Sequence, residues 1–374
     1  MLDIFYNATL LILAVFWLLS FGNLRGKQFI ETLKKHRKVL TAVLWVAVLV
    51  FAAVFVVYFS YFDRIHDIDE AVTASVISFK HGIDPYDHKV APRFTGPYSD
   101  TVTFSMGYYN YLPFDLMAYS GAYVVFGWTG TPVWFVLSNL LFSAVAMFMI
   151  QRITKVQWET FIPIAGIVAL FYSFDNASLT LMLMVASAYV LWMGARHSEV
   201  FSLILMALAA LTKVYAAVPF AILLLYLIQK EVRSRDWRKL GEALVAAVSS
   251  GTMAVAMMVP FGIMNVINDA VLFHSSEGTR VGTSVGGTLL SDIMLTSPWF
   301  SVVGLVVVVA ALLISLRMKS LNDRVVFVSI CLLLTIVKSS QAPLTVGGVY
   351  LAFKLREMYV NRAAAADKAS SSAS

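Results

Sequence analysis

The segment from Asp63 to Val90, DRIHDIDEAVTASVISFKHGIDPYDHKV, contains the side chains of this sequence best suited to acid–base chemistry. Asp63, Asp67, Asp69 and Glu70 fall within eight residues of one another, in a chain of which only 13% is charged. A carboxylate in such a place can take a proton from a hydroxyl group, as general base catalysis requires. A solvated helix end would explain the same residues without any chemistry.

The residue pattern predicts a helix over 66–80. On that helix Asp67 and Glu70 share one face, because residues three and four positions apart are neighbours, whereas Asp69 points elsewhere. Only one of the two aspartates is therefore expected to enter a cleft. Gly82 is expected to end the helix, since glycine accepts a positive φ, and an Asp-Pro turn follows it.

The composition excludes a water-soluble protein. Of 374 residues, 59% are hydrophobic and 13% are charged, against roughly 45–50% and about 25% in soluble domains. A bilayer requires about 20 apolar residues for each crossing helix, and the long runs here favour helices over a barrel. Apolar runs lie near residues 3–21, 39–61, 107–127, 132–150, 161–174, 177–195, 200–212, 214–228, 242–264, 298–316, 325–338 and 343–353.

These runs predict an all-α, polytopic transmembrane helical bundle of about ten to twelve spans. Residues 1–362 are expected to form a single domain, followed by a disordered tail at 363–374 that is rich in small and polar residues. The start of the chain has no basic segment before its first apolar run, so residues 3–21 count as a first helix rather than a removable signal peptide.

Short basic segments between the apolar runs indicate the topology. Residues 25–38, 229–239 and 317–324 are rich in Lys and Arg, which marks the cytoplasmic side by the positive-inside rule. The external side then holds the loops 62–106 and 265–297, the first of which is long enough to carry short juxtamembrane helices. The net charge of +6 comes from these segments and does not indicate a nucleic-acid partner.

Lys213 separates two apolar runs that are each too short to be an independent span. One continuous helix over 200–228 would place the basic segment 229–239 outside. Two short helices that meet at Lys213 avoid this conflict and place Lys213 at the external surface, and the same reasoning places Asp175 and Asn176 there.

One conflict remains in this topology. Arg152 and Lys155 should be cytoplasmic, yet two full crossings between Tyr111 and Ile150 would place them outside. Either the run 107–127 is partly interfacial or the charge rule fails locally, and the sequence leaves both open.

Three motifs occur in an order that resembles a known family. An acidic residue and a small-residue helix precede Gly-Ile-Asp-Pro-Tyr at 82–86, and Tyr-Leu-Pro-Phe at 111–114 opens an apolar run. Leu-Thr-Lys-Val-Tyr at 211–215 is followed by Pro219. This order, over residues 60–230, resembles the polyprenol-phosphate-mannose-dependent mannosyltransferases of the GT-C glycosyltransferase superfamily, in which two prolines usually follow the tyrosine where this chain has Leu112 and Pro113.

The resemblance implies a GT-C-like enzyme of the plasma membrane with its active site on the external face. Such an enzyme transfers a hexose, here expected to be mannose, from a polyprenyl-phosphate donor to a hydroxyl of a glycan, lipid or glycoprotein acceptor. Asp67 is the first choice for the general base and Asp69 the second. We assign no metal ligands, although the acidic cluster leaves a divalent cation open.

The leaving group would be a lipid phosphate, so a cation near the external surface should stabilise the developing charge. Lys213 is the first candidate for this role, and a lysine snorkelling to the interface is the alternative. In the loop 265–297, Arg280 could also bind the phosphate and His274 the substrate, whereas a solvated loop would need neither.

Other residues of the same segments are candidates for contacts with the substrate. Glu70 could assist Asp67, and Tyr86 and Tyr111 could stack on a sugar or line the groove for the lipid. Aromatic side chains at a membrane interface are common without such a role.

Two other classes of function compete with a transferase. A transporter or flippase would be expected to carry ionisable residues in mid-helix and to have interrupted helices in two related halves. A membrane scaffold without catalysis would leave the acidic cluster unexplained. The acids cluster near one loop and no halves match in the sequence, which favours the transferase.

Overall fold

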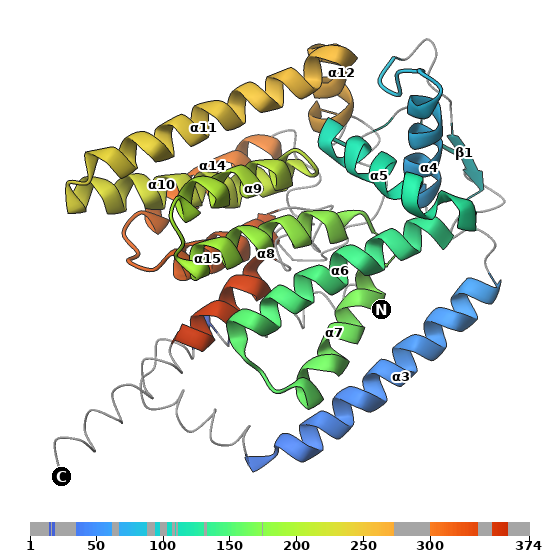
Figure 1. Ribbon diagram of the computed structural model, residues 1–374, viewed down its shortest axis with the longest axis horizontal. Coiled ribbons are helices and arrows are strands. Elements are labelled where there is room, and N and C mark those ends of the chain that lie inside the picture. Colours follow the sequence, from blue (N-terminus) through green and yellow to red (C-terminus); the bar gives the residue numbers. More distant parts are fainter. Residues whose placement is uncertain are drawn as a thin grey trace. The chain divides into compact units, whose positions relative to one another are not determined.

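The computed structural model of the chain is almost entirely helical where it is described, as the apolar runs predict (Figure 1). Most of the predicted first helix at 3–21, most of the loop 265–297 and the tail at 363–374 lie outside the described residues. The structure describes residues 15, 17–18, 35–61, 67–87, 94–97, 103–106, 109, 111–130, 133–173, 175–272, 300–335 and 346–357.

The chain divides into two compact units. A terminal unit contains Met1–Lys38, Ile150–Val156 and Gly282–Ser374, and a central unit contains Val39–Met149 and Gln157–Val281. In the terminal unit, α14 (Phe300–Ser315) packs against α15 (Leu321–Thr335), and a further helix covers 346–357.

The central unit holds the candidate site. Its long helices are α3 (Arg37–Tyr61), α4 (Asp67–Lys80), α5 (Pro113–Phe126), α6 (Val133–Thr154), α7 (Trp158–Tyr172), α8 (Ala177–Met193), α9 (Ser198–Ala210), α10 (Ala217–Ser234) and α11 (Trp237–Met258). Single turns continue the chain at η1 (Gly127–Thr129), η2 (Val214–Ala216), η3 (Val259–Phe261), α12 (Ile263–Val266) and η4 (Ile267–Leu272). One antiparallel hairpin adds to the helices: β1 (Phe94–Pro97) pairs with β2 (Thr103–Met106), with Phe94 opposite Met106.

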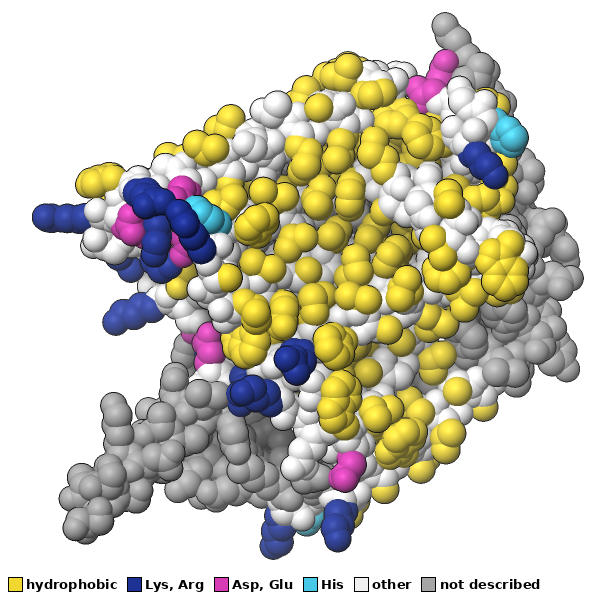
Figure 2. Space-filling view, in the orientation of Figure 1, with side chains coloured by type: hydrophobic (Ala, Val, Ile, Leu, Met, Phe, Trp, Pro, Cys, Tyr) yellow, Lys and Arg dark blue, Asp and Glu magenta, His cyan; other side chains and the backbone are white. Residues whose placement is uncertain are grey.

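Three helical segments among the described residues are long and apolar enough to cross a membrane: Val133–Thr154, Val214–Ser234 and Trp237–Phe261. Hydrophobic side chains cover the face of the molecule over α9, α10 and α11 (Figure 2). Lys and Arg gather at one end of these helices, where α10 ends and α11 begins. Such a surface suits lipid rather than water, which agrees with the composition.

Helices α8 to α11 pack side by side as an antiparallel set. Helix α9 packs against α8, α10 and α11. The hydroxyls of Thr180 and Thr212 lie 2.7 Å apart, as do those of Ser187 and Ser202. Helices α8 and α9 are therefore antiparallel. One end of the set therefore carries Lys213, between α9 and α10, and the opposite end carries Arg235, between α10 and α11. We call them the Lys213 end and the Arg235 end.

Tyrosine side chains of α5 contact the first half of α6. The rings of Tyr123 and Trp134 lie 5.1 Å apart, and the Tyr119 hydroxyl donates to Asn139 Oδ1. Asn139 Nδ2 in turn donates to the carbonyl of Ser173, just before α8, at 3.1 Å. The middle and the last turn of α5 thus contact the first half of α6.

Helices α3 and α7 run in the same direction and approach closely. The Thr41 and Thr160 hydroxyls lie 3.0 Å apart near the start of each helix. Further along, a Cβ added at Gly166 would lie 2.9 Å from a methyl group of Val48. A larger residue at position 166 would therefore require Val48 or one of the two helices to shift.

Candidate functional site

Lys213 lies at the turn where α9 ends and η2 begins, as the sequence predicts. Its Nζ lies 2.8 Å from Oδ1 of Asp175, and the two side chains are only 13% and 15% exposed. The same Nζ lies 5.4 Å from the centroid of the Tyr111 ring, within the range of a cation–π contact. The lysine is therefore held between a carboxylate and an aromatic face, with a small part of it accessible.

Asp175 is fixed by the start of α8. Its Oδ1 accepts a hydrogen bond from the backbone N–H of Ala177 at 2.8 Å as well as from Lys213. This oxygen satisfies one of the N–H groups that a helix leaves unpaired at its start. The position of the lysine is thus tied to the first turn of α8.

Tyr86 joins the end of the α4 segment to the same place. Its hydroxyl donates to the carbonyl oxygen of Tyr111 at 2.6 Å, and the whole residue is buried. Its ring packs edge to face on Tyr109, with centroids 5.6 Å apart. The covered ring and the donated hydroxyl show that Tyr86 holds the backbone of Tyr111, and its predicted contact with the substrate stays a prediction.

The turn before Tyr86 forms as predicted. Helix α4 ends at Lys80, and Gly82 has φ of +74°, which allows the N–H of Ile83 to reach the carbonyl of Ser78 at 2.9 Å. Asp84 Oδ1 then accepts the backbone N–H of Tyr86 at 2.9 Å, the pattern of an Asx turn.

Burial changes the acidity of the side chains in this turn. It raises the pKa of the Tyr86 phenol well above its ordinary value, so the hydroxyl stays protonated and remains a donor. Burial also raises the pKa of Asp84 above its ordinary 3.8, while the N–H of Tyr86 acts in the opposite direction and Asp87 adds to the rise.

Asp115 is a residue of this site that sequence reasoning missed. It lies in the first turn of α5 and is fully buried. Its Oδ2 accepts hydrogen bonds from the hydroxyl of Tyr109 at 2.6 Å and from Nδ2 of Asn176 at 3.1 Å. Its Oδ1 and the Oδ1 of Asn176 have no hydrogen-bond partner within the described part of the chain. The signal was a lone acid after a proline at the start of an apolar run, where a negative charge suits the helix N-terminus.

These contacts close into a continuous network. Tyr86 contacts Tyr111, Tyr111 contacts Lys213, Lys213 pairs with Asp175, and the neighbouring Asn176 leads through Asp115 and Tyr109 back to Tyr86. We call this set the Lys213 cluster: Tyr86, Tyr109, Tyr111, Asp115, Asp175, Asn176 and Lys213. Four segments that are distant in sequence supply it.

The other predicted site residues are described less fully. Asp67, Asp69 and Glu70 lie in the first turn of α4, which confirms the predicted helix, but their side chains are outside the described atoms. His274 and Arg280 lie outside the described residues altogether. The structure thus brings together Lys213, Tyr111 and Tyr86, and the roles predicted for all eight residues stay predictions.

No protein-family model, curated protein or solved structure matches this chain.

Lys213 is the one cation of the cluster, beside the carboxylates of Asp115 and Asp175. Lys213 uses one of its N–H groups on Asp175, and the ammonium retains further donors. Within the described ranges, no group of three or more His, Cys, Asp or Glu side chains could hold a metal ion. A partly exposed lysine over an aromatic ring can take up a phosphate oxygen while Asp175 keeps it in place.

Proposed function

We propose that this chain is a multi-pass membrane glycosyltransferase of the GT-C type. It transfers a hexose, with mannose as the first candidate, from a polyprenyl-phosphate donor to an acceptor hydroxyl. The observation that carries the proposal is the Lys213 cluster: an ammonium group held by Asp175 and Tyr111, at the end of the helices opposite to the basic turn at Arg235.

The orientation follows from the charges at the two ends of the helices. The segment 229–239 is strongly basic, and the positive-inside rule assigns it to the cytoplasm. The Lys213 end then faces the exterior, and so do α4, the β hairpin and α5. The active site is accordingly proposed on the external side of the plasma membrane.

The reaction needs a base and a cation. The acceptor oxygen forms a bond to the anomeric carbon, and its proton passes to the carboxylate of Asp67 or Asp69. The bond between that carbon and the phosphate oxygen breaks, and its electron pair stays on the departing polyprenyl phosphate. Lys213 stabilises the charge that develops there. Direct displacement with one carboxylate base inverts the anomeric configuration.

The remaining side chains receive supporting roles in this scheme. Tyr111 offers an aromatic face beside the lysine, and Tyr86 holds its backbone. Arg280 is proposed to reach the phosphate from its loop, and His274 and Glu70 to contact the substrate. The donor carries its sugar on a lipid, so a soluble nucleotide-binding domain is not needed.

The test is transfer by purified protein in liposomes. Radiolabelled polyprenyl-phosphate mannose is supplied with a membrane acceptor fraction, and both labelled product and released polyprenyl phosphate are measured. We expect Asp67→Asn or Asp69→Asn to lower the rate by about 10²–10⁴-fold, the usual contribution of a general base. Lys213→Ala should lower turnover more than Lys213→Arg, which retains the charge.

A matched control is Lys239→Ala, which removes a lysine from the Arg235 end and should transfer at the wild-type rate. Each variant is first checked for helicity and for a single peak in size-exclusion chromatography. Wild-type rates in both aspartate variants would overturn the assignment of the base. If the wild type moves the labelled lipid across the bilayer without releasing polyprenyl phosphate, the protein is a flippase and the proposal fails.

A further inference from the structure

The Arg235 end of the central unit carries a dense group of charges. It is built by the α8–α9 connection, the last turns of α10 and the first turns of α11, and Lys and Arg side chains project from it (Figure 2). Arg235 ends α10 in the left-handed conformation, with φ of 58°, which turns the chain sharply into α11. The turn therefore presents its side chains outward from the ends of two neighbouring helices.

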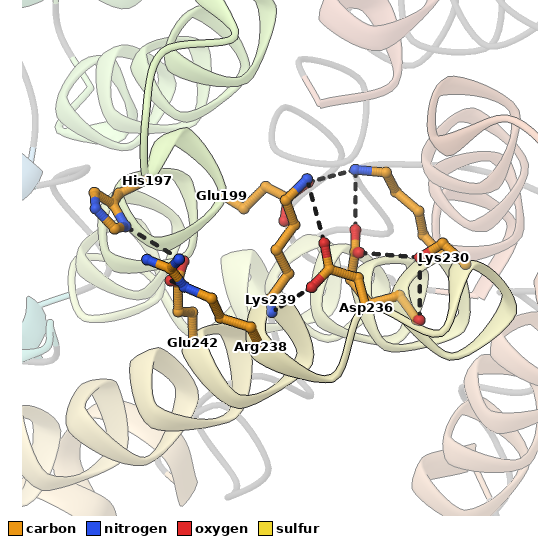
Figure 3. A network of polar contacts seen from close by, with 9 residues as sticks. His197, Glu199, Lys230, Asp236, Arg238, Lys239 and Glu242 are labelled. Carbon is orange, nitrogen blue, oxygen red and sulfur yellow. Dashed lines mark hydrogen bonds and ion pairs between the residues drawn. The ribbon is translucent and has the colours of Figure 1, made fainter.

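Each of the four carboxylates of this region lies within ion-pair distance of a basic side chain (Figure 3). Glu199 pairs with Lys230, and Glu231 lies 3.1 Å from the same lysine. The side chain of Asp236 accepts the backbone N–H of Lys239 at 3.1 Å, which caps α11, and its other oxygen lies 3.8 Å from the ammonium of that residue.

The last of these carboxylates is shared by two basic side chains. Glu242 lies 3.2 Å from Arg238 and 3.3 Å from His197. Two lysines, one arginine and one histidine thus account for the four acids of this end.

Three basic side chains are left over. Arg196, Arg233 and Arg235 are exposed, and no carboxylate of the described residues lies within ion-pair distance of any of them. A guanidinium group offers a planar fork of donors that matches the oxygens of a phosphate. The surplus positive charge is therefore concentrated on groups that are free to bind an anion.

An aromatic and an apolar surface adjoin these arginines. Trp237 follows Arg235 in the first position of α11 and is 67% exposed. Further along the same helix, Val245 and Val248 are 66% and 70% exposed. Tryptophan is enriched at the level of lipid headgroups, and exposed valines on a helix long enough to cross a bilayer suit acyl chains.

We propose that the turn between α10 and α11 binds the headgroup of an anionic phospholipid of the cytoplasmic leaflet. Arg233 and Arg235 contact the phosphate, with Arg196 beside them, and Trp237 lies at the headgroup while the acyl chains follow α11. Charge selects the occupant: three unpaired arginines complement a net negative headgroup, whereas a zwitterionic one brings its own cation. The apolar face beside the arginines favours a lipid over a free phosphate. The proposal does not depend on the transferase function.

The experiment uses the full-length protein in a neutral detergent. Short-chain phosphatidylglycerol, phosphatidylcholine and glycerophosphate are added in separate titrations, and binding is read from the rise in the thermal midpoint and from native mass spectrometry. We expect phosphatidylglycerol to bind most tightly and glycerophosphate to give no shift at the same concentrations. In Arg233→Gln/Arg235→Gln, binding should weaken by about 25-fold, or about fivefold for each arginine near an anionic lipid.

The matched control is Arg238→Gln/Lys239→Gln, which removes the same amount of charge from basic groups that already have partners. It should bind phosphatidylglycerol within about twofold of the wild type, since its arginine fork at Arg233 and Arg235 is intact. Equal binding of phosphatidylglycerol and phosphatidylcholine by the wild type would overturn the proposal, as would an equal loss in the two double variants. A shift with glycerophosphate as large as that with the lipid would show a simple phosphate site instead.

Discussion

The ion pair between Lys213 and Asp175 can be measured by replacing each partner alone and both together. Asp175→Asn removes the negative charge but retains an oxygen that can accept the N–H of Ala177. Lys213→Met removes the positive charge but retains an apolar stem beside the ring of Tyr111. The double-mutant cycle then isolates the interaction of the two charged groups from the other contacts of each residue.

The burial of the pair sets the expected magnitude. Exposed ion pairs contribute about 0.2–1 kcal/mol, whereas hydrogen bonds to charged groups contribute about 1.5–3 kcal/mol when they are sheltered from water. The two side chains here are 13% and 15% exposed and 2.8 Å apart. We therefore expect a coupling free energy of about 1.5–3 kcal/mol. The double variant should lose less stability than the two single variants lose in sum, by this amount.

The assay is reversible unfolding in mixed micelles with increasing dodecyl sulfate, followed by circular dichroism. A control cycle on Lys239 and Asp236, whose side chains are 53% and 38% exposed and 3.8 Å apart, should give less than about 0.5 kcal/mol. If the coupling between Lys213 and Asp175 were as small as that of the control pair, the reasoning would be refuted. The lysine would then not be held by the start of α8, and the geometry of the proposed site would lose its anchor.

Three further predictions concern other parts of the central unit. Asp115→Ala should destabilise the protein by about 2–5 kcal/mol in the same assay, since it strands two buried donors, and Asp115→Asn should cost less; equal losses would contradict the hydrogen-bonding role. The folded protein binds a proton on Asp84 more tightly than the unfolded chain does, so this residue lowers stability as the pH rises through and above its ordinary pKa of 3.8. The thermal midpoint of Asp84→Asn should accordingly rise relative to wild type between pH 3 and pH 7, and a gap that shrinks with pH would be the wrong sign. In a Cys331→Ser background, an impermeant maleimide should label Ile83→Cys in intact cells and Arg196→Cys only after permeabilisation; labelling of both from one side would exclude the proposed topology.

Local signals in the sequence were sufficient where the structure depends on neighbouring residues. Gly82 ends the segment of α4 because a left-handed residue can close the last turn, and this can be read from the residue type. The break at Lys213 follows from the length of two apolar runs and the charge beyond them. Both features need no knowledge of what packs nearby.

Features that depend on distant contacts could not be predicted in this way. Tyr119 and Tyr123 in the run 107–127 contact the beginning of α6, and no pattern within their own run indicates these contacts. Asp115 lies in the same apolar run. Its hydrogen bond from Asn176, 61 residues further along the chain, could not be predicted from the residues around it. The β hairpin could not be predicted either, because its strands are only four residues long and β1 contains glycine and proline.

The spread of the Lys213 cluster along the chain has a consequence for how the protein comes into being. Its residues lie between positions 86 and 213, so the ribosome adds Asp115 and Asp175 before Lys213. Until residue 213 is made, Asp175 lacks the ammonium group with which it pairs. A chain that stalls before residue 213 would thus leave the Asp175 carboxylate without its ion pair, a state that quality-control proteases could distinguish from the finished protein.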